Sequence, residues 1–290
     1  KKSYYDVIIV GGSYAGLSAA MSLGRSLRKT LVIDSGTPCN IRSPHSHNFL
    51  TNDGKTPAEI SITSKEQVEK YQTVEFYKGL AVKGSQTIEG FEIITEKGDA
   101  FYSRKIIFAT GLIDVMPDIE GFRECWGISV IHCPYCKGYE FRNEATGILA
   151  NGESAYDLAV LVFNLTKDLT IYTNGSHELK PEQIEKLKRN RIDVIETEVS
   201  GILHSGGYIQ GLEFRDGSVR NMKAVYSRIA FKQQCNIPAD LGCEMIPSGH
   251  FKSDIMQMTN IKGVFVCGDN SFPMRSVSAA VFTGSMAGAA

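Results

Sequence analysis

The chain begins with an apolar, β-branched run, Asp6 to Val10, that stops at the pair Gly11-Gly12. Small residues with helical spacing follow from Ser13 to Leu27. A second apolar run, Thr30 to Ile33, ends at Asp34. The pattern predicts a βαβ unit with an acidic residue at the tip of its second strand.

Further elements are predicted before residue 112. Pro57 to Tyr71 reads as a helix, because Thr56 supplies a cap and Pro57 a first-turn proline. Apolar alternation predicts three strands, at Glu75 to Val82, Thr87 to Thr95 and Ala100 to Phe108. The last strand runs into Ala109-Thr110-Gly111.

The strand, turn and helix pattern then occurs a second time. Its predicted parts are a strand at Thr146 to Ala150, a turn at Asn151 to Glu153, a helix at Ser154 to Asn164 and a strand at Leu169 to Thr173. An offset of 139 relates the two copies, and it pairs Gly11 with Ala150, Ser13 with Gly152 and Gly16 with Ala155. The repeat implies two nucleotide-type folds.

The remaining pattern indicates that one fold interrupts the other. A helix is predicted at Pro181 to Arg189, hairpin-like strands continue to Phe231, and the last strand at Gly263 to Val266 precedes a helix from about Ser276. We therefore expect an α/β protein with two Rossmann-like nucleotide-binding domains, the second inserted into the first. The expected first domain is residues 1–113 plus 240–290, and the inserted domain is residues 114–239.

The composition is that of a globular protein, with 42% apolar and 22% charged residues. The net charge of −1 disfavours nucleic acid or an anionic membrane as a partner. No apolar run approaches the roughly 18 residues of a spanning helix, and the start leads directly into a strand. We expect a cytoplasmic protein with no membrane association.

The turn Gly11 to Gly16 reads GGSYAG, with Ser13 where a GxGxxG turn has its middle glycine. Gly11 permits the tight turn, Gly16 permits close helix-to-strand packing, and the helix N-terminus presents amides to a pyrophosphate. Asp34 follows at the distance expected of a ribose acceptor. Gly268-Asp269 ends another apolar strand, where a carboxylate can accept hydrogen bonds from a polyol. A plain strand-to-helix connection and a plain turn are the alternatives.

Cys133 and Cys136 form a CxxC directly after His132, whereas the other five of the seven cysteines are scattered singly. Two thiols at this spacing can close a disulfide, and a helix N-terminus and a neighbouring imidazolium favour the reactive thiolate. Half of a zinc site and a pair of inert thiols are the alternatives. A zinc site would need a second ligand pair, for which His45 and His47 are candidates that read equally as loop histidines.

These motifs together resemble the low-molecular-weight thioredoxin reductases and the related flavin-dependent dithiol oxidases of the gliotoxin type. GGSYAG, ATG at residues 109–111, the inserted CPYC, the second nucleotide-type turn and the late CGD follow the family order over nearly the whole chain. The resemblance implies a homodimer in which Cys136 is the flavin-proximal thiol and Cys133 exchanges with substrate. It also implies an FAD site formed by Gly11, Ser13, Ala15, Gly16, Asp34, Asn48, Val82, Thr110, Gly111, Gly268, Asp269, Ser276 and Val277.

The second turn departs from the reductase pattern. A pyridine-nucleotide reductase should carry GxGxxA there, followed by arginines for the 2′-phosphate of NADPH. This chain reads ANGESA from Ala150 to Ala155, and its next strand ends in Tyr172-Thr173-Asn174-Gly175 without an arginine cluster or a ribose-binding acid. We therefore do not expect efficient NAD(P)H binding.

A second departure lies beside the CxxC. The reductases carry an acidic residue directly after the second cysteine, where this chain has Lys137. We expect His132 to move the proton instead, since an imidazole with a pKa near 6.5 can take and return a proton at neutral pH. A histidine that merely packs beside the helix is the alternative, and Glu140 is the next candidate.

The sequence thus predicts an FAD-dependent dithiol/disulfide oxidoreductase with Cys133 and Cys136 as its redox-active disulfide and no bound metal. It is expected to act as a dithiol oxidase, or with an electron donor other than NADPH. The expected substrate is a small dithiol or disulfide, or a thioredoxin-like protein. An NAD(P)H-dependent thioredoxin or disulfide reductase is the first alternative, and a flavin- or zinc-binding regulatory module is the second.

Overall fold

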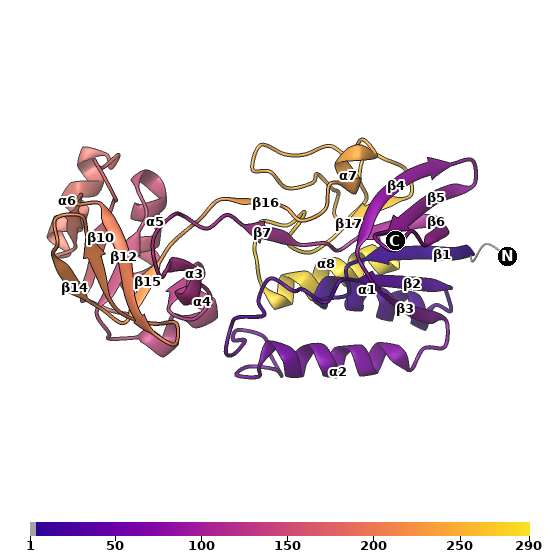
Figure 1. The fold of residues 1–290 in the computed structure, drawn as a ribbon, viewed down its shortest axis with the longest axis horizontal. Coiled ribbons are helices and arrows are strands. Elements are labelled where there is room, and N and C mark those ends of the chain that lie inside the picture. The colour runs from indigo at the N-terminus through magenta and orange to yellow at the C-terminus, as the bar shows by residue number, and fades with distance from the viewer. Residues whose placement is uncertain (1–3) are drawn as a thin grey trace. The chain divides into compact units, whose positions relative to one another are not determined.

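A computed structural model describes residues 4–290, which form two compact units (Figure 1). The first unit contains the chain up to Ile41, Lys55–Ile113 and Phe231–Ala290. The second unit contains Arg42–Gly54 and Asp114–Ala230. These units differ from the expected domains at residues 42–54 and 231–239, and the domain boundaries themselves stay predictions.

Contacts within the second unit explain why the segment 42–54 belongs to it. The Arg42 guanidinium donates a hydrogen bond to the Arg123 carbonyl at 2.6 Å. His47 Nε2 lies 3.5 Å from Glu140 Oε1. Neither contact has a signal in the local sequence pattern, because each joins residues more than 80 positions apart.

The first unit is built on a seven-stranded sheet with the order β3-β2-β1-β6-β5-β4, in which β17 also pairs with β6. Its strands are β1 (Tyr4–Val10), β2 (Thr30–Asp34), β3 (Val74–Lys78), β4 (Ala81–Thr87), β5 (Gly90–Thr95), β6 (Ala100–Phe108) and β17 (Val264–Val266). Strands β1, β2, β3, β6 and β17 pair in parallel, whereas β4 and β5 are antiparallel. Ile8 and Ile9 of β1 are both fully buried, as expected for a parallel strand covered on both faces.

The predicted single strand at Glu75 to Val82 was wrong, because the chain turns at Gly79 and divides it into β3 and β4. The Gly79 amide donates to the Asp34 carbonyl at 3.0 Å, and a Cβ at Gly79 would overlap the Tyr77 ring. The strand predicted from Thr87 begins only at Gly90, because Thr87 and Gly90 close a hairpin. Apolar residues continue through both turns, so the sequence pattern predicts neither turn.

The helices of the first unit are α1 (Tyr14–Arg25), α2 (Pro57–Glu69), α7 (Ile237–Asp240) and α8 (Val277–Ala289). Figure 1 shows α1, α2 and α8 on one side of the sheet and α7 on the other. The predicted Thr56 cap is confirmed, because Thr56 and Glu59 form a reciprocal capping box. Helices α1 and α8 approach so closely that a Cβ at Gly284 would overlap the Ala15 carbonyl.

The second unit holds a parallel sheet with the order β11-β10-β9-β15-β8 and an antiparallel sheet with the order β12-β13-β14. The parallel strands are β8 (Val130–Ile131), β9 (Thr146–Leu149), β10 (Leu169–Tyr172), β11 (Asp193–Ile195) and β15 (Ala224–Tyr226). The antiparallel strands are β12 (Val199–Ser205), β13 (Tyr208–Phe214) and β14 (Val219–Asn221). A separate short pair consists of β7 (Leu112–Asp114) and β16 (Phe231–Gln233).

Short helical segments α3 (Phe122–Cys125), α4 (Pro134–Lys137) and the 3-10 turn η1 (Tyr139–Phe141) precede the longer helices α5 (Gly152–Val162) and α6 (Pro181–Arg189). The turn predicted at Asn151 to Glu153 was wrong, because Asn151 caps α5 and the helix begins at Gly152. Over residues 4–290, no helix has the length and apolar character needed to cross a membrane.

Strand pairing shows the internal repeat directly. In the first unit Val7 pairs with Thr30, and in the second unit Thr146 pairs with Leu169, which is the same register displaced by 139 residues. Each unit therefore contains a βαβ crossover of the nucleotide-binding type. The expected α/β class, with one Rossmann-like fold inserted into another, is confirmed.

Candidate functional site

Parallel pairing brings several predicted site residues to one sheet edge of the first unit. Val10 pairs with both Ile33 and Phe108, and Phe108 also pairs with Val266. The segments that leave these strands must therefore start side by side. They carry Gly11, Asp34, Thr110, Gly111, Gly268 and Asp269. The carboxyl edge of such a sheet is where open α/β folds bind ligands.

The glycine turn at this edge has the geometry of an anion cradle. Gly11 has a φ of +103°, and a Cβ there would overlap the Ala109 carbonyl. A Cβ at Gly16 would overlap the Gly11 carbonyl, so both positions require glycine. Ser13 is the N-cap residue of α1, and its side chain caps no helix amide. The first-turn amides, including that of Ala15, are therefore placed to bind a pyrophosphate.

Asp34 is fixed beside the same turn. Its Oδ1 accepts a hydrogen bond from the Gly12 amide at 2.9 Å. A Cβ at Gly12 would overlap the Asp34 side chain, which shows how closely the turn packs on the carboxylate. One carboxylate oxygen thus orients the group, and the other can serve a ribose hydroxyl.

Asp269 lies in a charged setting that the sequence did not indicate. Arg275 Nε is 3.5 Å from Asp269 Oδ2, and both side chains are largely buried. The Cys39 thiol contacts the same oxygen at 3.8 Å. Gly268 has a φ of +80°, and its amide donates to Thr283 Oγ1 at 2.9 Å. A polyol that donates a hydrogen bond to Asp269 would therefore share the carboxylate with Arg275.

Thr110 and Ser276 are also held by hydrogen bonds. Asn270 Nδ2 donates to Thr110 Oγ1 at 3.3 Å and to the Phe108 carbonyl at 2.8 Å. Asn270 is fully buried, and its Oδ1 has no hydrogen-bond partner among residues 4–290. An unsatisfied buried acceptor beside Thr110 fits a site that receives a polar ligand. Ser276 Oγ accepts from the Ala279 amide at 3.1 Å and caps α8, whose first residue is Val277.

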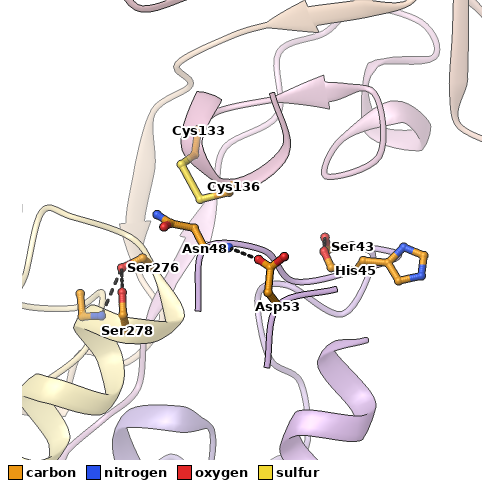
Figure 2. The surroundings of a disulfide bond; sticks show 9 residues. Ser43, His45, Asn48, Asp53, Cys133, Cys136, Ser276 and Ser278 are labelled. Atoms are coloured by element: carbon orange, nitrogen blue, oxygen red, sulfur yellow. Dashed lines mark hydrogen bonds between the residues drawn. A yellow bond between two sulfur atoms is a disulfide. The ribbon is translucent and has the colours of Figure 1, made fainter. Parts of the chain in front are cut away.

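Three other predicted FAD residues have distinct placements. Gly111, with a φ of +66°, continues the turn after β6. Val82 is half exposed at a register shift between β4 and β5, a β-bulge that leaves it out of the ladder. Asn48 lies in the second unit, where its amide donates to Asp53 Oδ1 at 2.8 Å (Figure 2). The residues predicted to bind FAD therefore all lie in the first unit, except Asn48.

In the second unit Cys133 and Cys136 form a disulfide, with 5.3 Å between their Cα atoms (Figure 2). Strand β8 leads to this pair from the parallel sheet, and Cys133 is the N-cap residue of α4. Both cysteines are partly accessible. A partly accessible disulfide on a short helical turn can exchange with an external thiol.

His132 lies beside an aromatic pair. Its ring centroid is 6.0 Å from that of Trp126, which stacks on Phe122 at 5.7 Å. Trp126 Nε1 donates to Asp114 Oδ2 at 3.0 Å, which fixes the indole. The proton-carrying role of His132 stays a prediction.

The burial of Lys137 was not predicted from the sequence, where Lys137 mattered only because it replaces the acidic residue of the reductases. Its side chain is buried at 8% exposure, and its Nζ has no hydrogen-bond partner among residues 4–290. Burial lowers the pKa of Lys137 to about 8, while the nearby Glu140 carboxylate opposes this change. Nothing in the spacing of this four-residue helix signals that the lysine points inward.

The second turn differs physically from the first. Asn151 Oδ1 accepts hydrogen bonds from the Gly152 amide at 2.8 Å and from the Glu178 amide at 2.9 Å. Asn151 Nδ2 also donates to the Ser176 carbonyl at 2.9 Å. The Glu178 side chain lies 3.5 Å from where a Gly152 Cβ would be, and Glu153 pairs with Lys180 at 2.9 Å. The turn is closed by its own amide side chain and bordered by carboxylates.

A metal centre finds no support in the part of the chain that the structure describes. No group of three or more His, Cys, Asp or Glu residues there could hold a metal ion. The rings of His45 and His47 are 6.3 Å apart, and His47 contacts Asp53 and Glu140.

Known proteins are similar to this chain in sequence. The profile of the pyridine nucleotide-disulphide oxidoreductase family matches residues 5–284. Thioredoxin reductase tcpT of Claviceps purpurea (strain 20.1) is 34% identical over 297 residues, which cover 98% of this chain and 92% of the relative.

Solved structures of known proteins have the same fold as this chain. An oxidoreductase from Agrobacterium tumefaciens has a TM-score of 0.92 and 34% identity, covering 99% of this chain and 96% of that one. The thioredoxin reductase from Streptococcus pyogenes MGAS5005 has a TM-score of 0.90 at 22% identity, covering 99% of this chain and 97% of that one, and shows the shared fold. The chain therefore belongs to the pyridine nucleotide-disulphide oxidoreductase family, as a thioredoxin reductase-like enzyme with a disulfide between Cys133 and Cys136.

Proposed function

We propose that the enzyme is an FAD-dependent dithiol oxidase that takes electrons from a dithiol rather than from NADPH. The observation that carries this proposal is the contrast between the two nucleotide-type turns. The first turn leaves the α1 amides uncapped by Ser13, whereas Asn151 occupies the Gly152 amide in the second. A helix N-terminus that is already capped by a side chain loses a main contact for a pyrophosphate.

The first unit supplies the residues that would hold FAD. Gly11, Ser13, Ala15 and Gly16 form the pyrophosphate turn, and Asp34 is held by the Gly12 amide in position for a ribose. Thr110, Gly111, Gly268, Asp269, Ser276 and Val277 would complete the site, with Val82 and Asn48 assigned by family resemblance. When bound, FAD would supply a two-electron acceptor for the reduced cysteine pair, with molecular oxygen as the final oxidant.

The cysteine pair would perform the exchange with substrate. A substrate thiolate attacks Cys133 Sγ, the bond between Cys133 and Cys136 breaks, and its electron pair stays on Cys136 as a thiolate. The second substrate thiol then attacks the mixed disulfide at the substrate sulfur and releases Cys133. His132 would accept the proton of that second thiol. The products are a substrate disulfide and a reduced cysteine pair.

An NAD(P)H-dependent disulfide reductase is the second candidate. The family name and the thioredoxin reductase tcpT favour it, because these relatives are named for that chemistry. In either case we propose a cytoplasmic homodimer that acts on a small dithiol or disulfide, with a thioredoxin-like protein as the other possible substrate.

Anaerobic titration of the purified flavoprotein distinguishes the two candidates. We expect dithiothreitol to bleach the visible flavin absorbance and NADPH or NADH to leave it largely unchanged on the same timescale. Rapid bleaching by NADPH would instead establish the reductase. Stoichiometric zinc without flavin would favour the regulatory module.

A further inference from the structure

Lys137 is unusual for its burial without a partner. Among the Asp, Glu, Lys and Arg residues at positions 4–290, Lys137 alone is buried. A lysine is rarely buried unless it is paired, because taking an ammonium out of water is costly. Its Nζ nevertheless makes no hydrogen bond to the described part of the chain. Such a group requires a physical explanation.

Glu140 connects Lys137 to groups on two other elements. Glu140 of η1 acts electrostatically on Lys137 and contacts His47 of the segment 42–54 at 3.5 Å. His47 also contacts Asp53 at 3.6 Å. From β15, the buried Tyr226 approaches the backbone at Gly138, and burial together with Glu140 raises the pKa of Tyr226 well above its usual range. Glu140 is thus the one carboxylate that acts on both Lys137 and Tyr226.

The position of Lys137 relates it to the disulfide. It follows Cys136 directly and shares the four-residue helix α4 with it. A closed disulfide carries no charge and cannot compensate a buried ammonium. An opened disulfide leaves a negative thiolate in the same helical turn, so the ammonium is better accommodated after the disulfide opens.

We propose that Lys137 is a positioning residue for dithiol exchange, whose ammonium stabilises the thiolate left on Cys136 when the disulfide opens. This inference deepens the proposed function and rests on it for the substrate. In the step, the substrate sulfur bonds to Cys133 Sγ, the disulfide bond breaks, and the electron pair remains on Cys136, the residue directly before Lys137 in α4. The substrate enters as its thiolate, so its proton has already passed to the solvent. The Glu140 carboxylate acts against the effect of burial and favours the charged form of Lys137.

The test measures the Cys136 thiol itself. The flavoprotein is reduced, and alkylation of Cys136 by iodoacetamide is followed by mass spectrometry between pH 5 and about pH 10, a range that spans thiol titration. Lys137→Met should move the alkylation profile to higher pH and slow alkylation at pH 7 by about tenfold. Lys137→Arg should retain most of the wild-type rate. Lys167→Met, which changes an exposed lysine of the same unit, should leave the profile unchanged.

Glu140→Gln provides a second variant that keeps the lysine in place, in case Lys137→Met does not fold. Loss of the carboxylate should favour the neutral amine and slow alkylation at pH 7 in the same direction, though less than Lys137→Met does. A wild-type profile in folded, flavin-containing Lys137→Met or Glu140→Gln protein would overturn the proposal. Because alkylation needs neither a dithiol substrate nor NADPH, failure of the proposed electron donor is detected separately by the flavin titration.

Discussion

Asn151 and Glu178, 27 residues apart, are joined by a 2.9 Å hydrogen bond from the Glu178 amide to the Asn151 carboxamide oxygen. The same oxygen accepts from the Gly152 amide, so the start of α5 is capped from within the chain. The equivalent start of α1 has no side-chain cap. Two copies of one βαβ pattern, paired in the same register, therefore differ in whether a side chain already occupies an amide at the start of the helix.

We predict that NADPH at near-millimolar concentration reduces the flavin at least roughly a hundredfold more slowly than an equal concentration of dithiothreitol. Binding a pyrophosphate at α5 would first break the Asn151 hydrogen bond to Gly152, and no arginine cluster is present to compensate. Stopped-flow absorbance under nitrogen measures both rates. Equal rates would show that the cap opens readily and that the enzyme is a pyridine-nucleotide reductase.

The two cysteines should differ when each is replaced. Cys136→Ser leaves Cys133 able to attack a substrate disulfide but removes the thiol that resolves the product, so a stable mixed disulfide should accumulate. Cys133→Ser should accumulate far less. Intact-protein mass spectrometry after exposure to an oxidised small dithiol detects the adduct. If both variants form it to the same extent, the assignment of Cys133 as the exchanging thiol is wrong.

His132→Ala should lower the dithiol-dependent rate by roughly a hundred- to ten-thousand-fold, the range of general acid-base catalysis, while FAD stays bound. The ring packs beside Trp126 of the same unit, and His132 is not among the residues proposed to hold FAD, so the cofactor should be retained. Steady-state oxygen consumption with dithiothreitol measures the rate. His132→Gln is the matched control for packing. An unaltered rate in His132→Ala would assign the ring a packing role and direct attention to Glu140.

The sequence predicts the strands and helices whose apolar pattern is bounded by clear turn residues. The capped start of α2 and the span of α6 are examples, because Thr56, Pro57 and Pro181 act on the backbone locally. The turn at Gly79 was not predicted, because apolar residues continue through it. The Asp34 carbonyl that accepts a hydrogen bond from the Gly79 amide is 45 residues away, so it leaves no local signal.

The candidate site likewise has features that the sequence predicts and features that it does not. Its glycine turn and CxxC are contiguous motifs that the sequence displays. The Asn151 cap, the Arg275 contact with Asp269 and the burial of Lys137 depend on packing between distant segments or on which way a side chain points. None of these leaves a periodic or local signal.

Gly16→Val should abolish FAD binding. A Cβ at Gly16 would overlap the Gly11 carbonyl, so the turn cannot keep its shape with any larger residue. Gly98→Ala is a control, because a Cβ at Gly98 meets no atom within 4 Å although its positive φ disfavours alanine. Mass analysis of the cofactor released on denaturation should give FAD from wild type and Gly98→Ala, and none from Gly16→Val. Release of FMN from wild type would contradict the dinucleotide site.

Lys137→Met should stabilise the oxidised protein at pH 7. The folded-state pKa of Lys137 is lowered to about 8 from its usual value of 10.5, so the folded protein binds fewer protons than the unfolded chain between these two values. The destabilisation by the buried ammonium is therefore fully present below pH 8 and is lost as the pH rises toward 10.5. After allowance for partial solvent screening, we expect a gain of roughly 1–2 kcal/mol at pH 7.

Thermal unfolding followed by the fluorescence of Trp126, the single tryptophan, measures this effect in the unit that holds Lys137. The difference between variant and wild type should shrink at pH 10.5, where the wild-type amine is neutral in the folded state. It should also shrink in the reduced protein at pH 7, because a Cys136 thiolate then compensates the wild-type ammonium. A gain that is equal in oxidised and reduced protein would indicate that Lys137 and the cysteine pair do not interact, since a simple packing improvement is independent of the redox state.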